Sequence, residues 1–197
     1  MGFSFPGIAE DVGRLKNLLR EGLDLIHRGP LPSPSLLNLA CGRADETGVL
    51  LETLSLPGQG GSYLGLDLRV AEIQEAKRRW GRSWLPDGVV DFRVADAAHE
   101  HQLPTADRYD FIFIRHQNYW DAPATWDQIY RHALMRLREH GLLLFTSYFE
   151  REHELALAAL QTRGARLLLS LPHKASRALA DAPGKSVDRR LAILSHA

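Results

Sequence analysis

Short apolar runs alternate along the chain with longer segments in which apolar residues recur every three or four positions. Runs such as 36–40 and 109–114 are almost wholly apolar, which is typical of strands buried on both faces of a sheet. Strands separated by helices in this way predict right-handed βαβ units and a mostly parallel sheet. The predicted strands are 36–40, 62–66, 89–95, 109–114, 141–147, 165–171 and 190–194.

The segments between most of these strands have the period of an amphipathic helix. The last two strands are instead joined by a coil-like stretch that contains Pro183 and Gly184, so this final pair should be antiparallel. The pattern therefore predicts an α/β fold, a three-layer sandwich with a mostly parallel seven-stranded sheet and an antiparallel closing strand. The predicted helices are 7–28, 47–54, 70–80, 122–138 and 149–162.

The beginning of the chain is set apart by a proline-rich linker. Pro30, Pro32 and Pro34 forbid a helix and favour extended chain, but the stretch is too short to separate two domains. We expect residues 1–35 to form an N-terminal helix and linker that pack on the core as a possible lid, and residues 36–197 to form the α/β domain.

Composition narrows the class of protein. The 197 residues carry 24 basic and 24 acidic side chains, and this zero net charge argues against a nucleic-acid partner. Cys41 is the single cysteine, so no internal disulfide can form and a reducing compartment is expected. We see no membrane-length apolar run and no targeting signal in the opening residues, which predicts no membrane association and a cytoplasmic location.

Two strands end in an aspartate at the point where the apolar run stops. Asp67 follows the second strand and Asp96 follows the third. Ligands of open parallel sheets bind beyond the carboxyl ends of the strands, beside the first strand. Carboxylates placed there accept hydrogen bonds from ribose hydroxyls or from an adenine amino group. The sequence therefore predicts a nucleoside-containing ligand.

Five segments then resemble class I S-adenosylmethionine-dependent methyltransferases. Residues 37–44 (LNLACGRA) are similar to the glycine-rich first motif, 65–67 to the acidic ribose-binding motif, 96–97 to the adenine-contacting motif, and 109–114 and 137–144 to the fourth strand and to the hairpin before the fifth. The resemblance implies a Rossmann-like methyltransferase sheet and S-adenosyl-L-methionine as cofactor. The cofactor-binding residues it implies are Asn38, Ala40, Cys41, Gly42, Asp67, Leu68, Asp96, Ala97 and Arg115.

The first motif departs from the family pattern at three positions. The family has an acid where this chain has Asn38, and glycines where it has Ala40 and Ala44. Alanine disfavours a positive φ and thickens the loop beside the ligand. These changes leave open a second function, a non-catalytic methyltransferase-fold protein that acts in binding or regulation.

The residues after the fourth strand are the candidate catalytic groups. His116 has a suitable pKa for a general base, and Tyr119 or Trp120 could form an aromatic wall beside a cationic methyl donor. We predict His116 and Tyr119 as catalytic, against the alternative of a packed histidine and aromatic pair. Arg115 could bind the carboxylate of the donor or form a surface ion pair.

Two further segments are rich in polar side chains. His99, Glu100 and His101 are consecutive, and no further ligand follows them at the spacing typical of a metal site, so we predict a solvated loop and no metal site. Residues 163–190 contain seven basic and two acidic side chains, and Lys174 and Arg177 could hold an anionic acceptor, although the pattern favours a solvated loop.

The prediction from the sequence is an S-adenosylmethionine-dependent methyltransferase. No long insertion follows the fifth strand and no Asn-Pro-Pro-aromatic motif follows the fourth, so we expect a small-molecule acceptor and no nucleic acid. A nicotinamide-dependent oxidoreductase is less consistent with the residues, because Gly42 stands without the further glycines of a dinucleotide loop and Asp67 lies 25 residues beyond it.

Overall fold

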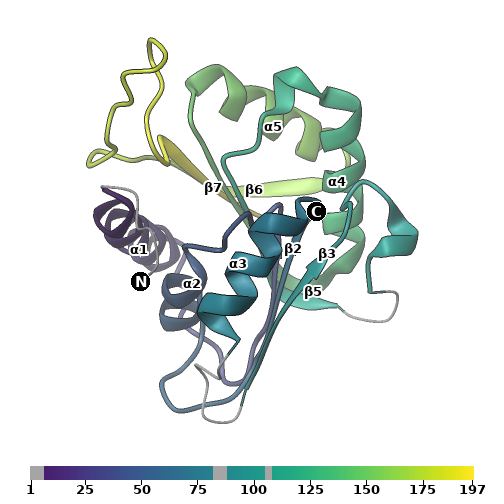
Figure 1. Cartoon of the computed structure of the whole chain (residues 1–197). Helices are drawn as coiled ribbons and strands as arrows, with labels where there is room; N and C mark the ends of the chain where they lie inside the picture. The colour runs from purple at the N-terminus through teal and green to yellow at the C-terminus, as the bar shows by residue number, and fades with distance from the viewer. Residues whose placement is uncertain (1–6, 82–87, 105–107) are drawn as a thin grey trace.

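The computed structural model describes residues 7–81, 88–104 and 108–197 (Figure 1). Residues 1–6, where a targeting signal was sought in the sequence, lie outside the described residues. In the part that is described, no helix is both long and apolar enough to cross a membrane.

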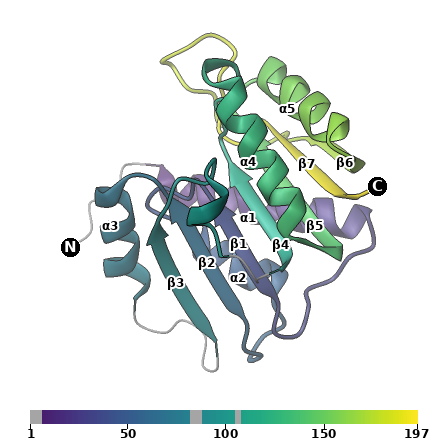
Figure 2. The same ribbon diagram turned by 90° about the vertical axis from the view of Figure 1, so that its right-hand side faces the viewer.

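The seven strands form one sheet in the order β3-β2-β1-β4-β5-β7-β6 (Figure 2). All neighbouring pairs from β3 to β5 are parallel, whereas β7 is antiparallel to both β5 and β6. The predicted α/β fold with an antiparallel closing strand is therefore confirmed, and β6 runs in the same direction as β1 to β5. The strands are β1 Ser35–Leu39, β2 Ser62–Asp67, β3 Val89–Val94, β4 Tyr109–Arg115, β5 Leu137–Ser147, β6 Ala165–Pro172 and β7 Arg190–His196.

Helices cover both faces of the sheet and make the outer layers of the sandwich (Figures 1 and 2). One apolar core lies between the sheet and α1, α2 and α3, and a second lies between the opposite face and α4 and α5. The helices are α1 Ile8–Leu25, α2 Thr47–Leu54, α3 Val70–Trp80, α4 Pro123–Arg136 and α5 Glu150–Thr162, with short 3-10 turns η1 Glu100–Gln102 and η2 Tyr119–Asp121.

The start of β5 differs from the prediction. The sequence suggested a helix to residue 138 and a turn at Gly141, but α4 ends at Arg136 and β5 already begins at Leu137. Gly141 lies inside the strand, where its pairing with β4 shifts register. A Cβ at Gly141 would come within 2.9 Å of the Tyr109 carbonyl oxygen, so the glycine permits a close approach of two strands.

The N-terminal helix α1 packs against the sheet together with α2. Its residues Leu15, Leu18 and Leu19 are buried, and a Cβ at Gly22 would lie 2.7 Å from a methyl group of Leu191 on β7. Close packing of this kind makes α1 part of the core layer. The role of α1 as a lid stays a prediction.

A salt bridge joins α1 to the segment between β6 and β7. Arg177 donates from Nε to Oδ1 of Asp11 at 3.0 Å and from Nη2 to Oδ2 at 2.5 Å. Arg14 also pairs with Asp11. Burial raises the pKa of Asp11, but the hydrogen bonds from Arg177 and Arg14 outweigh it and leave the pKa below its usual value. Segment 173–189 is thus tied to α1 through Arg177.

Candidate functional site

A cleft of about 680 Å³ opens at the carboxyl ends of β1 and β4, where the strand order reverses. In parallel sheets this position is the usual ligand site. The loop after β1 forms one wall, and the residues after β4 and β5 form the other. The cleft is lined by Ala40, Cys41, Gly42, Arg43, Asp45, Glu46, Arg69, Glu72, Arg115, His116, Asn118, Trp126 and Tyr148.

The loop after β1 adopts the left-handed conformation that the altered glycine motif put in question. Ala40, Gly42 and Ala44 have φ of 54°, 54° and 56°. The two alanines therefore keep the backbone shape that glycine favours, at a conformational cost of roughly 1–2 kcal/mol each.

Replacing Ala40 with glycine should relieve this strain. We expect Ala40→Gly to stabilise the fold by about 0.5–1 kcal/mol, after allowing for the greater freedom of glycine in the unfolded chain. Ala44→Gly is the matched comparison. The methyl group of Ala44 is fully buried, and the loss of its hydrophobic stabilisation, about 0.8 kcal/mol, should cancel the gain from the relieved backbone strain. Urea unfolding of both variants measures the difference, and equal effects at the two positions would contradict this account.

Asp67 joins the ends of β1 and β2 through its carboxylate. Oδ2 accepts from the Gly42 N–H at 2.8 Å and from Arg69 Nη2 at 3.0 Å, and Oδ1 accepts from Arg69 N and Nε, both at 2.9 Å. Burial raises the pKa of Asp67, but the hydrogen bonds from the Arg69 side chain and from the two backbone N–H groups bring it below its usual value. The carboxylate is therefore ionised, and its four acceptor positions are already used.

Asn38 lies in the interior of β1 and does not line the cleft. Its Nδ2 donates to Glu46 Oε1 at 2.5 Å and to the Tyr63 hydroxyl at 2.9 Å. Glu46, directly before α2, does line the cleft and is almost fully buried. The negative charge missing at position 38 is thus present at Glu46, held by the Asn38 amide.

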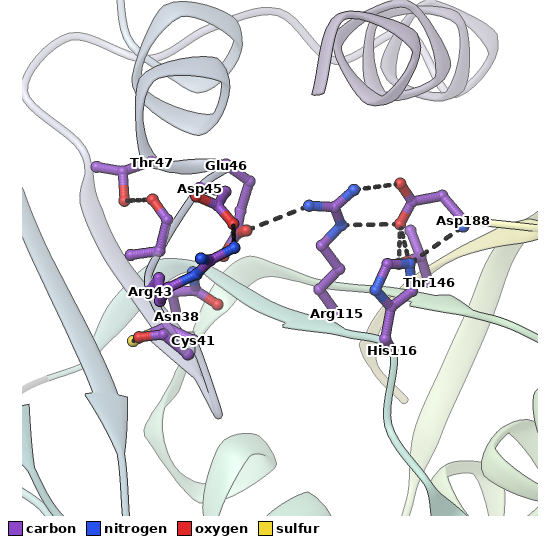
Figure 3. A network of polar contacts seen from close by, with 12 residues as sticks. Asn38, Cys41, Arg43, Asp45, Glu46, Thr47, Arg115, His116, Thr146 and Asp188 are labelled. Carbon is purple, nitrogen blue, oxygen red and sulfur yellow. Dashed lines mark hydrogen bonds and ion pairs between the residues drawn. The ribbon is translucent and has the colours of Figure 1, made fainter. Parts of the chain in front are cut away.

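A buried ion network forms the opposite wall (Figure 3). Arg115 donates to both carboxylate oxygens of Asp188, from Nε at 3.0 Å and from Nη2 at 2.6 Å, and its Nη1 lies 3.4 Å from Glu46 Oε2. Thr146 adds a hydroxyl donor to Asp188 Oδ1 at 2.7 Å. The ion pair of Arg115 is therefore buried, which corrects the alternative of a surface pair. Burial raises the pKa of Asp188, but the charges of Arg115 and His116 outweigh it and hold the pKa well below 3.8.

His116 is bound to the same carboxylate. Its Nε2 lies 2.8 Å from Asp188 Oδ1 and 3.1 Å from the Asp188 backbone nitrogen, and its ring stacks on Tyr148 with 3.8 Å between centroids. Burial lowers the pKa of His116 more than Asp188 raises it, so the imidazole is neutral at pH 7. Figure 3 shows the second ring nitrogen on the side away from Asp188.

The other predicted site residues lie outside the lining. Leu68 is exposed, Ala97 is buried, and Asp96 accepts from the Ala98 N–H at 2.9 Å and contacts His99 Nδ1 at 2.9 Å. Tyr119 donates to Asp127 at 2.9 Å and stacks on a neighbouring tyrosine. Of the predicted cofactor residues, the structure gathers Ala40, Cys41, Gly42 and Arg115 at the cleft, with Asp67 behind Arg69.

Three residues of the site were not singled out by the sequence reasoning. Glu46 belongs to no recognised motif, and Asp188 lies in a coil 72 residues after its partner His116. Tyr148 directly follows β5, and its ring stacks on His116. Within the described ranges, no three His, Cys, Asp or Glu side chains are grouped to hold a metal ion.

Glu152 supports the Tyr148 side of the cleft. Its Oε2 accepts from the N–H groups of Tyr148 at 2.8 Å and Phe149 at 3.3 Å. Burial raises the pKa of Glu152 to about 7, although these two hydrogen bonds lower it. Its carboxyl is therefore only partly ionised near neutral pH.

This raised pKa predicts a pH dependence of stability. The folded pKa of Glu152 lies above the ordinary 4.5, so its favourable contribution is complete below pH 4.5 and is lost as pH rises through 7. The free energy of unfolding of Glu152→Gln, relative to that of wild type, should therefore rise by about 2–3 kcal/mol between pH 4.5 and pH 8. Exposed Glu154 on the same helix provides the control, since Glu154→Gln should show no such trend in denaturant unfolding.

The comparisons with known proteins address the fold. No protein-family model and no curated protein matches the chain. Among solved structures, the N-methyltransferase NodS from Bradyrhizobium japonicum WM9 is 16% identical with a TM-score of 0.68, each chain being 98% covered. An S-adenosylmethionine-dependent methyltransferase from Clostridium acetobutylicum ATCC 824 is 12% identical with a TM-score of 0.67, covering 94% of this chain and 92% of that one.

A third structure was determined with a bound cofactor. Magnesium protoporphyrin IX methyltransferase from Synechocystis PCC 6803, with bound S-adenosylmethionine, is 13% identical with a TM-score of 0.66, and the match covers 100% of this chain and 87% of that one. At these identities the likeness establishes the fold: the chain has the Rossmann-like fold of S-adenosylmethionine-dependent methyltransferases.

Proposed function

We propose that the chain is an S-adenosylmethionine-dependent methyltransferase that acts on a small-molecule acceptor. The observation that carries the proposal is the cleft at the reversal of strand order, where the left-handed loop 40–44 meets Asp67 through the Gly42 N–H. The solved structures of the same fold include the S-adenosylmethionine-dependent methyltransferase from Clostridium acetobutylicum and the Synechocystis enzyme with bound S-adenosylmethionine. A cytoplasmic location stays a prediction from the sequence.

The residues present suit the cofactor in charge and shape. Three carboxylates and three guanidinium groups line the cleft, so it offers partners both to the positive groups of the cofactor and to its carboxylate. They are Asp45, Glu46 and Glu72, and Arg43, Arg69 and Arg115. Loop 40–44 and Asp67 would hold the nucleoside, provided that Arg69 leaves the carboxylate. When bound, the cofactor supplies a methyl group on a positively charged sulfur.

His116 is the group best placed to take a proton from an acceptor. Two groups of Asp188 meet Nε2: the charged Oδ1 at 2.8 Å favours a hydrogen on Nε2, and the backbone N–H, which points to the same nitrogen at 3.1 Å, opposes it. The contact with the carboxylate is shorter and involves a charge, so we assign the hydrogen to Nε2. The lone pair of Nδ1 then lies on the side away from Asp188 and is free to accept a proton. Tyr148 keeps the ring in place by stacking. Tyr119 lies outside the cleft lining, and its catalytic role stays a prediction.

Titration calorimetry tests the cofactor. We expect micromolar binding of S-adenosylmethionine and S-adenosylhomocysteine, no binding of NADH, and a loss of at least about 100-fold in Asp67→Ala, because the loop after β1 loses its anchor as well as a ligand contact. Binding of NADH alone would support the oxidoreductase reading. Absence of heat and of thermal stabilisation with the sulfur nucleosides at millimolar concentration would overturn the proposal.

One observation favours the non-catalytic alternative. The N–H groups of Gly42 and Arg69 use two of the four acceptor positions of the Asp67 carboxylate, and the Arg69 side chain uses the other two. The position expected for the ribose hydroxyls is therefore filled by a side chain of the protein itself. Screening small amines and hydroxyl compounds for transfer of a labelled methyl group distinguishes the two functions. A binding protein would retain the cofactor without transfer, whereas an enzyme should lose transfer, with cofactor binding intact, in His116→Gln.

A further inference from the structure

A second cavity, of about 550 Å³, lies beneath the segment between β6 and β7. In Figure 1 this segment is the yellow loop that projects beyond the sheet. The two hollows share no lining residue. Tyr148 contacts a residue of each: its ring stacks on His116 of the cleft, and Lys185 Nζ of the cavity lies 4.8 Å from the ring centroid. The cavity is thus distinct from the proposed cofactor cleft.

The cavity carries an excess of positive charge. Four cationic side chains line it, Lys174, Lys185, Arg189 and Arg190, against the single carboxylate of Glu150. Glu150 is shared, because Arg190 Nη1 lies 2.5 Å from Oε1 and Arg189 Nε lies 3.5 Å from Oε2. One carboxylate cannot neutralise two guanidinium groups, so positive charge remains at this wall.

Lys174 adds a charge that no residue of the described ranges balances. Lys185 is paired with Asp181 at 2.6 Å, whereas Lys174 makes no hydrogen bond or ion pair with any other residue in the described part of the chain. A lysine without a carboxylate partner, beside an incompletely neutralised arginine pair, is a suitable donor for an oxyanion.

The remaining wall of the cavity is apolar. Leu179, Ala182 and Pro183 contribute hydrocarbon surface next to the cationic groups. A ligand that fills the cavity would therefore combine an anionic group with an apolar body. Free inorganic phosphate would satisfy only one of these two surfaces.

The base of the loop is held in place before any ligand binds. Backbone hydrogen bonds join Ser186 N to the Tyr148 carbonyl at 3.0 Å and Arg189 N to the Ser147 carbonyl at 2.8 Å, and His173 Nδ1 contacts the Asp188 carbonyl at 2.9 Å. These bonds fix both ends of the segment against the sheet, so binding would cost little loop ordering.

We propose that this cavity binds the carboxylate or phosphate group of a small organic ligand with an apolar body. Lys174, Arg189 and Arg190 hold the anion, and Leu179 and its apolar neighbours cover the body of the ligand. Arg177, which the sequence had suggested for an anion, is committed to Asp11 and does not line the cavity. The proposal does not depend on cofactor binding, because none of the residues that line this cavity lines the cofactor cleft.

Nuclear magnetic resonance titration of the whole chain tests the site with named probes. Benzoate supplies an anion and an apolar ring, benzyl alcohol is its neutral counterpart, and phenyl phosphate tests the other oxyanion, all at constant ionic strength. We expect saturable backbone shifts within residues 172–190 for benzoate or phenyl phosphate, and at least about 5-fold weaker binding of benzyl alcohol.

Charge reversal identifies the residue responsible. Lys174→Glu should weaken binding of the anionic probe about 5- to 20-fold. The substitution removes the attraction between the lysine and the anion and adds a repulsion between the new carboxylate and the anion, and each of these exposed charge interactions contributes up to about 1 kcal/mol. Lys77→Glu makes the same charge change on exposed α3, away from the cavity, and should leave binding unchanged. Both side chains are exposed, and the spectra without ligand verify that the variants fold.

Three results would overturn the proposal. They are shifts that do not gather at residues 172–190, equal binding of benzoate and benzyl alcohol, or equal affinities of the Lys174 and Lys77 variants. None of them bears on S-adenosylmethionine binding, so a failure here is distinguishable from a failure of the methyltransferase proposal.

Discussion

Replacing Arg69 with alanine should tighten S-adenosylmethionine binding about 5- to 10-fold, the opposite of the loss expected for Asp67→Ala. In the structure, Arg69 donates to both oxygens of Asp67, so ribose hydroxyls must displace it. The Arg69 side chain is 56% exposed, and breaking such a pair costs about 1 kcal/mol. Removing the arginine removes that cost, while the Gly42 N–H still holds the carboxylate.

A matched control for this experiment lies on the adjacent helix. Arg78 makes the same two-pronged contact with Glu75, at 2.9 and 2.7 Å, and is 57% exposed. Arg78→Ala should therefore leave the calorimetric affinity unchanged. If Arg69→Ala instead bound the cofactor more weakly than wild type, Arg69 would be a ligand contact, and the account of it as a competitor would be wrong.

Replacing Asp188 with asparagine should lower the free energy of unfolding by about 3–5 kcal/mol. The side chain is fully buried and accepts from Arg115, Thr146 and His116. Without its charge, the buried guanidinium of Arg115 is left with Glu46 at 3.4 Å as its remaining carboxylate partner. An uncompensated buried charge of this kind is among the most destabilising changes in proteins.

Acid should remove the difference between wild type and this variant. The folded pKa of Asp188 lies well below 3.8, so its stabilising contribution is present above that value and is lost as pH falls through the folded pKa. Chemical denaturation at pH 7 and at successively lower pH measures the change. Asp181→Asn, on the same loop but exposed and paired with Lys185, should change stability by less than about 0.5 kcal/mol. A similar small effect at Asp188 would show that the network is not a stabilising one.

The sequence predicted the elements well where their signals are local. The helices 47–54 and 70–80 have the bounds of α2 and α3, because apolar period and end signals lie within each segment. The predicted start of β5 was wrong because Gly141 is required by the close approach of the Tyr109 carbonyl on the neighbouring strand β4, and not by a turn. A turn glycine and a bulge glycine look alike in a sequence, and only the neighbouring strand distinguishes them.

The candidate site shows the same division. Gly42 and Asp67 were expected together, and the structure joins them at 2.8 Å, since both lie at the ends of adjacent parallel strands. Asp188 could not be anticipated, because its role depends on a coil returning to Arg115 and His116 at the end of β4. Similarly, the sequence carried no signal that Glu46 would supply the charge absent from Asn38.

The position of β7 has a consequence for the order of folding during synthesis. This last strand pairs with β5 on one side and β6 on the other, so β6 leaves the ribosome with no hydrogen-bonding neighbour in the sheet. Until residues 190–196 emerge, the nascent chain exposes open edges on both β5 and β6, and such edges readily pair with other chains. The part of the sheet from β3 to β5 can assemble first, whereas β6 joins it only once β7 is in place between them.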